Sequence, residues 1–409
     1  MADLRKDAEK IYTAAIAGAL PENAVRRALA SFSAPGAVYV VAAGKAAWRM
    51  ARSAADVLGG ALTGGVVITK YGHAQGPIDR LEVFEAGHPV PDENGVRAAR
   101  RAIELVTPLG ESDTVVFLLS GGGSALFEQP LLPLGELGDI TRQLLACGAD
   151  IVEMNTVRKR LSAVKGGRFA QLCAPARVFS VVLSDILGDP VDMIASGPCC
   201  PDPSTCADAA RVVEKYGLSL SDAARALLRK ETPKQLQNVT TLITGSVGQL
   251  CASARETCAA LGYEPMVLTA SLCCTARDAG SFLASVAQYH AAGEKPLAFI
   301  AGGETVVHVT GKGRGGRNQE IALSAAKGLD GLPCAAVFSV GSDGTDGPTD
   351  AAGGYADGGT AAALRARGID IGAALDDNDA YTALQAAGGL IVTGPTGTNV
   401  NDLTVLLVR

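Results

Sequence analysis

Residues 114–124 read TVVFLLSGGGS: six apolar or β-branched residues precede Ser120, three glycines and Ser124. A run of this length bounded by turn residues is typical of a strand that is buried on both faces. Gly121, Gly122 and Gly123 allow successive backbone N–H groups to converge on an anion, because no Cβ atom interferes. The stretch therefore predicts a buried strand that leads into an anion-binding loop. A merely flexible strand-to-helix turn is the alternative.

The same arrangement recurs along the chain, where apolar runs alternate with Ala-rich helical stretches. This pattern is typical of a mostly parallel sheet with helices on its faces. In such sheets ligands bind outside the carboxyl ends of the strands, where helix N-termini also present free N–H groups. Five further strand-like runs end in turns that could contribute to one large, phosphate-tolerant site: Gly44-Lys45, Asp185, Ser246, Gly302-Gly303-Glu304 and Asp343.

The length of 409 residues suits two domains. Gly197–Ser204 and Lys230–Asn238 are rich in proline or polar residues and look like exposed connections. We therefore place the domain boundary near residue 236, which separates residues 1–236 from residues 237–409. Within the second part, the β-branched run Thr305–Val309 predicts a strand.

The composition excludes several classes of protein. The net charge is −6, and no cluster of Lys and Arg forms the basic surface that a nucleic-acid backbone requires. No uninterrupted apolar stretch is long enough to span a membrane, and the N-terminus lacks the features of a signal peptide. None of the ten cysteines forms a C-x-x-C pair, which favours reduced thiols. We expect a cytoplasmic protein, a monomer or a homodimer.

Residues 311–316, GKGRGG, formally match the G-x-G-x-x-G pattern of dinucleotide-binding loops. Lys312 and Arg314 lie inside the motif, Arg317 follows it, and no acidic residue closes a second strand about 20 residues later, where a ribose would need it. Three cations at a helix start suit a polyphosphate or a transferring phosphoryl group better. Solvated loop charges are the alternative for Lys312 and Arg314. No Walker A motif occurs.

Four side chains are candidates for catalysis. Lys45 and Arg317 are the cations best placed to neutralise a phosphate. Asp185 and Asp343 each come first after a strand, where a carboxylate could hold Mg²⁺ or accept the proton of a substrate hydroxyl. A purely structural role is the alternative for all four. The later acids of the same two turns are more typical of turn or cap residues: Asp189, Asp192, Asp346 and Asp350.

A basic helical segment, residues 154–169, supplies further candidates. Residues at i and i+4 of a helix can point together into a cleft and bind a small acid. We favour Asn155, Arg160 and Lys165 for such a face, and a solvated surface is an equally good interpretation. His88, in a turn that leads into a helix, is more typical of a structural residue.

Several longer stretches, in this order, resemble the class II glycerate kinases, whose C-terminal half is known as the MOFRL domain. The matching stretches span about residues 40–405: AAGKAA, GHPVPDENG, LLSGGGSAL, NTVRKRLSAVKGGR, VLSDILGDPVDMIASGP, AGGETVVHVTGKGRGGRNQE, SVGSDGTDGPTDAAGG and GPTGTNVNDL. By these motifs the family's essential cations fall on Lys45 and Arg317, and its glycine-rich loop falls on Gly121 to Ser124. The acidic turn at Asp376–Asp379 looks like local variation.

The resemblance implies a fold and an activity. The fold would be a Rossmann-like, doubly wound N-terminal domain and a smaller α/β C-terminal domain, with the active site in the cleft between them. The activity would be the phosphorylation of D-glycerate by ATP and Mg²⁺, usually to 2-phosphoglycerate. Substrate or phosphate contacts are then also expected at both sides of the GKGRGG loop: Gly302, Gly303, Glu304, Asn318, Gln319 and Glu320.

Two other functions are compatible with parts of the sequence. An NAD(P)H-dependent hydroxypyruvate reductase, a name that relatives of this family sometimes carry, would need a nicotinamide site at the cation-filled loop. A non-catalytic protein that binds an acid would leave Lys45, Arg317 and the acidic turns without a shared purpose. The residues by themselves support an anion-binding α/β enzyme with phosphoryl-transfer chemistry, and the resemblance supplies glycerate.

Overall fold

The computed structural model describes residues 3–184 and 191–409. They form two compact units. The first unit is Pro21–Thr244, and the second unit combines Gly245–Arg409 with the N-terminal segment that ends at Leu20. The division thus differs from the predicted boundary at residue 236, because the residues that follow this position form the last strand of the first sheet.

The first unit contains a six-stranded sheet in which every neighbouring pair is parallel. The order is β3-β2-β1-β4-β5-β6. All six carboxyl ends therefore lie at one edge of the sheet. The strands are β1 (Val38–Ala43), β2 (Leu62–Lys70), β3 (Leu81–Ala86), β4 (Thr114–Leu119), β5 (Arg177–Leu183) and β6 (Val239–Thr244).

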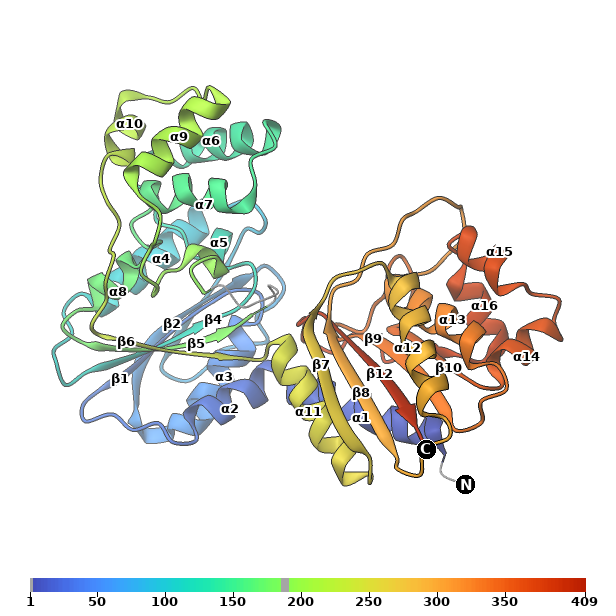
Figure 1. Ribbon diagram of the computed structural model, residues 1–409. Helices are drawn as coiled ribbons and strands as arrows, with labels where there is room; N and C mark the ends of the chain where they lie inside the picture. The colour runs from blue at the N-terminus through green and yellow to red at the C-terminus, as the bar shows by residue number, and fades with distance from the viewer. Residues whose placement is uncertain (1–2, 185–190) are drawn as a thin grey trace. The chain divides into compact units, whose positions relative to one another are not determined.

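Helices cover both faces of this sheet (Figure 1). Helices α2 (Pro21–Leu29) and α3 (Ala47–Leu58) pack on one face, while α4 (Glu93–Val106) and α8 (Arg168–Cys173) pack on the other. The α4 side buries alanines at helical spacing, Ala98, Ala99 and Ala102, which allows close contact between helix and sheet. The remaining helical segments are η1 (Gly59–Ala61), α5 (Gly123–Leu126), α6 (Leu134–Ala146), α7 (Ile151–Arg158), η2 (Lys159–Leu161), η3 (Ile194–Ser196), α9 (Cys206–Tyr216) and α10 (Asp222–Leu228).

The second unit contains a mixed sheet in the order β11-β10-β9-β12-β8-β7. Strand β12 runs antiparallel between β8 and β9, so its first residue, Asp402, pairs with Gly303 and Gly341 at the carboxyl ends of these two strands. The sequence does not reveal this insertion, because the last strand joins the centre of the sheet. The strands are β7 (Glu264–Leu272), β8 (Leu297–Gly303), β9 (Ala335–Gly341), β10 (Gly353–Asp357), β11 (Leu390–Ile391) and β12 (Asp402–Val408).

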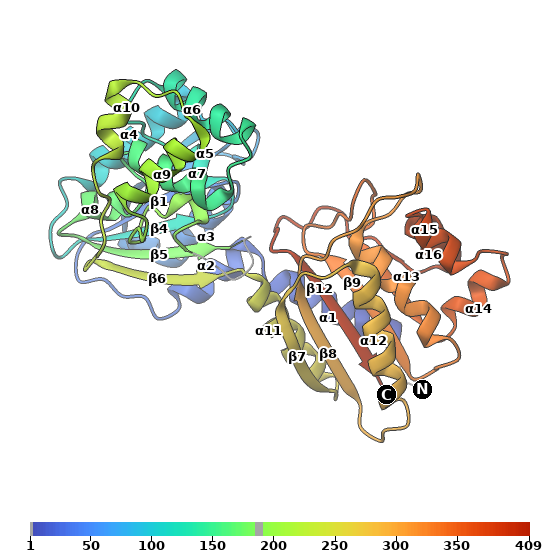
Figure 2. The same cartoon turned by 45° about the horizontal axis from the view of Figure 1, so that its top comes forward.

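Two helices lie on each face of this sheet (Figure 2). Helix α1 (Leu4–Gly18) packs with α11 (Val247–Ala260) on one face, because the apolar side of α1, which includes Ile11 and Ala15, joins the core of this unit. Helices α12 (Ala276–His290) and α13 (Arg317–Leu329) cover the other face. Three short helices pack on α13: α14 (Thr360–Arg365), α15 (Ile371–Asp376) and α16 (Ala380–Ala387).

One predicted strand was wrong. Residues 305–309 form only a single bridge, between Val306 and Thr275, because β8 ends at Gly303 with a φ of 154° and the chain leaves the sheet there. Val309 is 79% exposed. Among the described residues no helix is long and apolar enough to cross a membrane.

Candidate active site

The carboxyl ends of β1 and β4 lie side by side in the first unit. β1 pairs with β2 on one side and with β4 on the other, which is the kind of point where open α/β sheets bind ligands. Lys45 follows β1, and the loop Ser120–Ser124 follows β4. The backbone N–H of Lys45 donates to the carbonyl oxygen of Gly121 at 2.9 Å. The structure thus joins two of the predicted turns directly.

Close approach explains the glycines of this region. Gly44 has a φ of 126°, and a Cβ atom there would lie 2.5 Å from the carbonyl oxygen of Ser120. Gly122 has a φ of 85°, and its Cβ would lie 2.9 Å from Cδ2 of His88 and 3.2 Å from Cγ of Lys45. The imidazole of His88 and the stem of Lys45 therefore pack against the glycine-rich loop.

The loop presents unsatisfied donors next to a cation. In the part of the chain that the structure describes, the backbone N–H groups of Gly121 and Gly122 have no hydrogen-bond acceptor. The side chain of Lys45 is exposed and has no ion-pair partner among the same residues. Backbone N–H groups and an ammonium group at the carboxyl edge of a sheet favour an anion.

Further basic groups surround this point. Nδ1 of His73 lies 3.1 Å from the carbonyl oxygen of Lys45. Burial, followed by the charges of Lys45, Lys70 and His73, lowers the pKa of His88. His88 is therefore neutral at pH 7. The sequence interpretation of His88 as a structural residue missed its position against Lys45 and the loop.

Asn155 and Lys165 lie behind the loop. The Oδ1 atom of Asn155 accepts a hydrogen bond from Oγ of Ser196 at 2.8 Å. Ser196 in turn lies 3.5 Å from Oγ of Ser124. Lys165 is fully buried, and its Nζ donates to the carbonyl oxygen of Ser124 at 2.9 Å. Both side chains are buried and form their polar contacts with other residues of the chain, so they differ from the cleft-facing ligands that we predicted.

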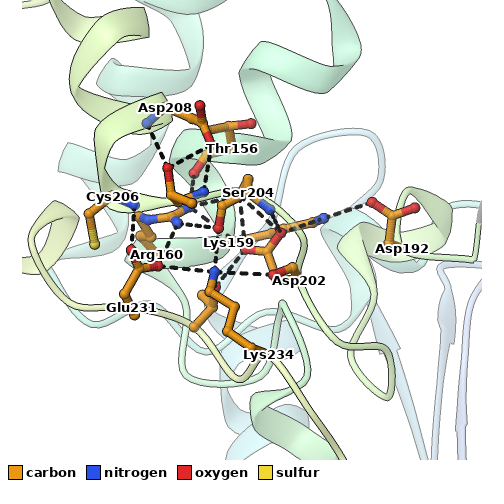
Figure 3. Close-up of polar contacts among 12 residues, drawn as sticks. Thr156, Lys159, Arg160, Asp192, Asp202, Ser204, Cys206, Asp208, Glu231 and Lys234 are labelled. Carbon is orange, nitrogen blue, oxygen red and sulfur yellow. Dashed lines mark hydrogen bonds and ion pairs between the residues drawn. The ribbon is translucent and has the colours of Figure 1, made fainter.

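Arg160 has no exposed surface at all. Its guanidinium donates to the side chain and the carbonyl oxygen of Ser204, at 2.9 and 2.7 Å, and lies 3.2 Å from the carboxylate of Glu231 (Figure 3). Lys159 lies beside it and contacts Asp192 and Asp202, each at 3.2 Å. The residues of this network neutralise one another's charges. Arg160 is therefore a buried residue that contacts other parts of the chain, and it differs from the cleft-facing ligand that we predicted.

The second unit presents a separate charged group at the carboxyl ends of β8 and β9. Arg317 begins α13, and its guanidinium contacts both oxygens of Asp402, at 2.5 and 3.1 Å, and Oε1 of Glu304 at 2.9 Å. Burial acts to lower the pKa of Arg317, but the hydrogen bond and charge of Asp402 outweigh burial and raise it. Nδ2 of Asn401 donates to Glu304 at 3.2 Å. The β12 pairing therefore supplies the main partner of Arg317.

A carboxylate occupies the N-terminus of α13. Asp346 accepts hydrogen bonds from the backbone N–H groups of Asn318 and Gln319, at 3.1 and 2.9 Å, and from the Gln319 side chain at 3.0 Å. Burial raises the pKa of Asp346 to about 6, against the hydrogen bonds from Gln319 and Asn318. Asn318 and Gln319, predicted as phosphate ligands, thus contact Asp346, which the sequence interpretation had treated as a turn residue.

The other predicted contacts of this unit have local explanations. A Cβ atom on Gly302 would lie 2.5 Å from Sγ of Cys251, and one on Gly303 would collide with the backbone of Leu272, so both glycines permit close packing. Glu320 is buried, its pKa is raised by burial, and it lies 3.7 Å from Arg277. Glu304 is half-exposed beside Arg317.

The first four backbone N–H groups of the GKGRGG loop, those of residues 311–314, have acceptors within the chain. Oδ1 of Asn378 accepts the N–H of Gly311 at 2.9 Å. Carboxylates of the same acidic turn accept the N–H groups of Lys312 and Arg314, at 2.9 and 3.1 Å. Because these four N–H groups bind Asp377, Asn378 and Asp379, they are not available to a pyrophosphate. The acidic turn, which looked like local variation, thus holds this loop in place.

Of the two predicted catalytic aspartates, Asp185 lies outside the described residues. Asp343 follows β9, and its Oδ1 accepts hydrogen bonds from the backbone N–H and the hydroxyl of Thr345, at 2.9 and 3.0 Å. A Cβ atom on Gly341 would lie 3.4 Å from Oδ1 of Asp343 and 3.5 Å from Oδ1 of Asp402. The two carboxylates therefore converge over Gly341.

Both parts of the chain match families. Residues 7–229 match a family described as a domain of unknown function (DUF4147), and residues 297–402 match the MOFRL family. The D-glycerate 2-kinase of Thermotoga maritima is 52% identical over 99% of this chain and 98% of its own length. The chain belongs to the class II glycerate kinase family. A crystal structure of the glycerate kinase of the same organism has a TM-score of 0.93 and covers 99% of both chains.

The family membership confirms the resemblance drawn from the motifs. It also extends to a relative with another name: a putative hydroxypyruvate reductase of Agrobacterium vitis is 40% identical over 99% of this chain and 94% of its own length. The mixed α/β architecture with a MOFRL part confirms the coarser part of the predicted fold class, an α/β chain whose C-terminal half is a MOFRL domain.

Sequence reasoning missed the positions of three residues in these candidate sites: His88, Asp346 and Asp402. Asp402 lay in the quoted motif GPTGTNVNDL without an assigned role, whereas His88 had been interpreted as a structural residue and Asp346 as a turn residue. Their roles depend on contacts between distant segments. Asp402 and Arg317, for example, are separated by 85 positions. No local spacing could have revealed this pair.

Proposed function

We propose that this glycerate kinase transfers the γ-phosphoryl group of ATP to a hydroxyl of D-glycerate, with 2-phosphoglycerate as the favoured product. The observation that carries the proposal is the pair of loops after β1 and β4, where Lys45 faces a glycine-rich turn with two unsatisfied N–H groups. The kinase name and the high identity of the Thermotoga maritima relative support it.

We assign the following roles to the residues. The N–H groups of the loop Ser120–Ser124 bind phosphate oxygens, and Lys45 supplies positive charge beside them. Arg317 contributes charge to the transferring group, and its ion pairs with Asp402 and Glu304 hold its planar guanidinium in one orientation. An aspartate, Asp185 or Asp343, accepts the proton of the attacking glycerate hydroxyl.

Mg²⁺ fits the residues at the end of β9. Kinase magnesium sites commonly use one or two carboxylates together with substrate phosphates rather than a closed protein cage. The convergence of Asp343 and Asp402 over Gly341 offers such oxygens, and among the described residues no group of three or more acidic, histidine or cysteine side chains forms a closed cage. Asp343 would hold the ion, with Asp185 as the second candidate. When bound, Mg²⁺ neutralises charge on the phosphates.

We also propose that the first domain is Rossmann-like. The parallel order β3-β2-β1-β4-β5-β6 with helices on both faces supports a Rossmann-like first domain. The active site would lie in a cleft between the two domains, so that closure excludes water and limits ATP hydrolysis. We further propose a cytoplasmic enzyme that acts as a monomer or a homodimer.

A coupled assay tests the proposal and assigns the product. The protein is mixed with ATP, Mg²⁺ and D-glycerate, and product is detected through enolase, first without and then with phosphoglycerate mutase. A signal without mutase means 2-phosphoglycerate, and a signal that requires mutase means the 3-isomer. Absence of any ATP-dependent product in both assays would exclude the kinase.

The reductase is the second candidate, because the Agrobacterium vitis relative carries that name. The dinucleotide motif gives it little support, since Asp377, Asn378 and Asp379 accept the first four backbone N–H groups of the GKGRGG loop. The test follows absorbance at 340 nm with NADH and hydroxypyruvate. Steady oxidation without ATP would favour the reductase.

A further inference from the structure

Three charged side chains lie directly behind the glycine-rich loop: Glu128, Arg158 and Lys165. Lys165 has no exposed side-chain surface and Glu128 has 1%. Arg158 is partly exposed at the end of α7, but its Nε atom is buried and has no hydrogen-bond partner in the part of the chain that the structure describes. Ion groups in such a place are costly to bury unless they are neutralised.

Both cations are directed at the loop. Lys165 Nζ donates to the carbonyl oxygen of Ser124 at 2.9 Å and to that of Phe127 at 3.1 Å. A guanidinium nitrogen of Arg158 donates to the same Ser124 carbonyl at 3.2 Å. Two cations therefore converge on the residue that ends the Ser120–Ser124 loop.

The charges of this group do not balance. Glu128 is the one carboxylate that forms an ion pair with Lys165 in the described part of the chain, at 3.3 Å, and no described carboxylate forms an ion pair with Arg158. Among the described residues of this group, two cations and one carboxylate leave an excess of one positive charge. The contrast with Lys159 is direct, because two aspartates flank that neighbouring buried lysine (Figure 3).

We propose that Glu128, Arg158 and Lys165 act as a positioning group that holds a net positive charge beneath the glycine-rich loop, and that the triphosphate of ATP is the anion that compensates it. The inference rests on the proposed function. It assigns the affinity of the loop for phosphate to buried charge as well as to the loop's own N–H groups. The three residues act through the loop and do not themselves contact substrate.

The protonation of Lys165 supports this assignment. Burial lowers the pKa of Lys165 to about 8, opposed by the charge of Glu128 and assisted by that of Arg158. An anion bound to the loop favours the charged ammonium and so raises this pKa. Binding of ATP near pH 8 should therefore take up protons, and the KM for ATP should rise as the pH increases above 8.

Charge-matched variants separate net charge from hydrogen bonding. Lys165→Met reduces the net charge of the group to zero, Glu128→Gln increases it to +2, and the double variant Lys165→Met/Glu128→Gln returns it to +1 without the lysine. For an assumed separation of about 9 Å and an effective dielectric constant near 20, the interaction of one unit charge with a phosphate changes affinity roughly twentyfold. We expect Lys165→Met to raise the KM for ATP ten- to twentyfold with a smaller change in kcat, and the double variant to lie within threefold of the wild type.

Lys159→Met is the matched control, because it removes a buried lysine whose charge is balanced within its own network. We expect it to lower the unfolding temperature but to leave the KM for ATP within twofold. Circular dichroism verifies folding of every variant. The charge role would be refuted if Lys165→Met kept the wild-type KM for ATP, or if the double variant were as impaired as the single one.

A measurement on the wild type avoids the risk that a core variant fails to fold. Calorimetric titration of ADP at pH 8, in two buffers of different ionisation enthalpy, should reveal proton uptake, and the absence of uptake would overturn the inference. The control at pH 6.5 should reveal less uptake by Lys165, because the lysine is then already charged. If the wild type does not phosphorylate D-glycerate, the proposed function fails; if it turns over but lacks this charge dependence, only the inference fails.

Discussion

Replacement of Gly122 by alanine tests how the glycine-rich loop works. This residue has a φ of 85°, in the left-handed region. A non-glycine residue there costs about 1–2 kcal/mol, and an alanine regains about 0.4–1 kcal/mol by restricting the unfolded chain. Backbone strain alone therefore predicts a loss of about 1 kcal/mol in the free energy of unfolding.

The new Cβ atom adds a local effect. It would lie 2.9 Å from Cδ2 of His88 and 3.2 Å from Cγ of Lys45, so both side chains must move by a few tenths of an ångström. We expect a total loss of about 2 kcal/mol in stability. Because Lys45 moves relative to the loop, kcat/KM for ATP should fall at least tenfold, which corresponds to about 1.4 kcal/mol of transition-state stabilisation.

Gly148→Ala is the matched control for this prediction. Gly148 has a φ of 74°, and nothing lies within 4 Å of its added Cβ atom. Urea unfolding should therefore give the strain cost alone, and the coupled kinase assay should give wild-type kinetics. If both variants lost stability to a similar extent and kept similar kcat/KM for ATP, the close packing of His88 and Lys45 on the loop would have no part in phosphate binding.

Three further predictions concern single side chains. Lys45→Met should lower kcat/KM for ATP at least a hundredfold without a change in the unfolding midpoint, because Lys45 is exposed and unpaired in the described structure. Lys230→Met, at another exposed lysine, is the control, and equal kinetics in both variants would contradict the role of Lys45. Arg317→Lys should lose most of the kcat although the charge remains, since one ammonium cannot replace the fork between Asp402 and Glu304; retention of full turnover by this variant would remove Arg317 from the mechanism. Because burial raises the pKa of Asp346 to about 6, the native state binds this proton more tightly than the unfolded chain does. The contribution of Asp346 to the free energy of unfolding therefore falls as the pH rises from about 4 to 7, by at most about 3 kcal/mol. Asp346→Asn should abolish that pH-dependent part in parallel urea titrations, and an unchanged pH profile would show that another group is responsible.

Local sequence patterns were sufficient for much of the fold. The strand at Thr114–Leu119 has the same bounds in the structure as in the prediction. An apolar run of strand length that ends at glycine indicates a buried strand, because the length of the run and the turn residue that ends it can both be read from neighbouring positions in the sequence. The less regular run Thr305–Val309 is also rich in β-branched residues, but in the described structure it forms only a single bridge.

The sequence alone also determined the motifs that define the family, and it placed Lys45 and the glycine-rich loop at strand ends. Only the tertiary structure decided that β12 inserts between β8 and β9, which brings Asp402 to Arg317. It likewise decided that Asp346 takes the N-terminus of α13 and that Arg160 is buried. The physical reason is that a side chain's charge can be read from its identity, whereas the partner that neutralises it is selected by packing between segments far apart in the chain.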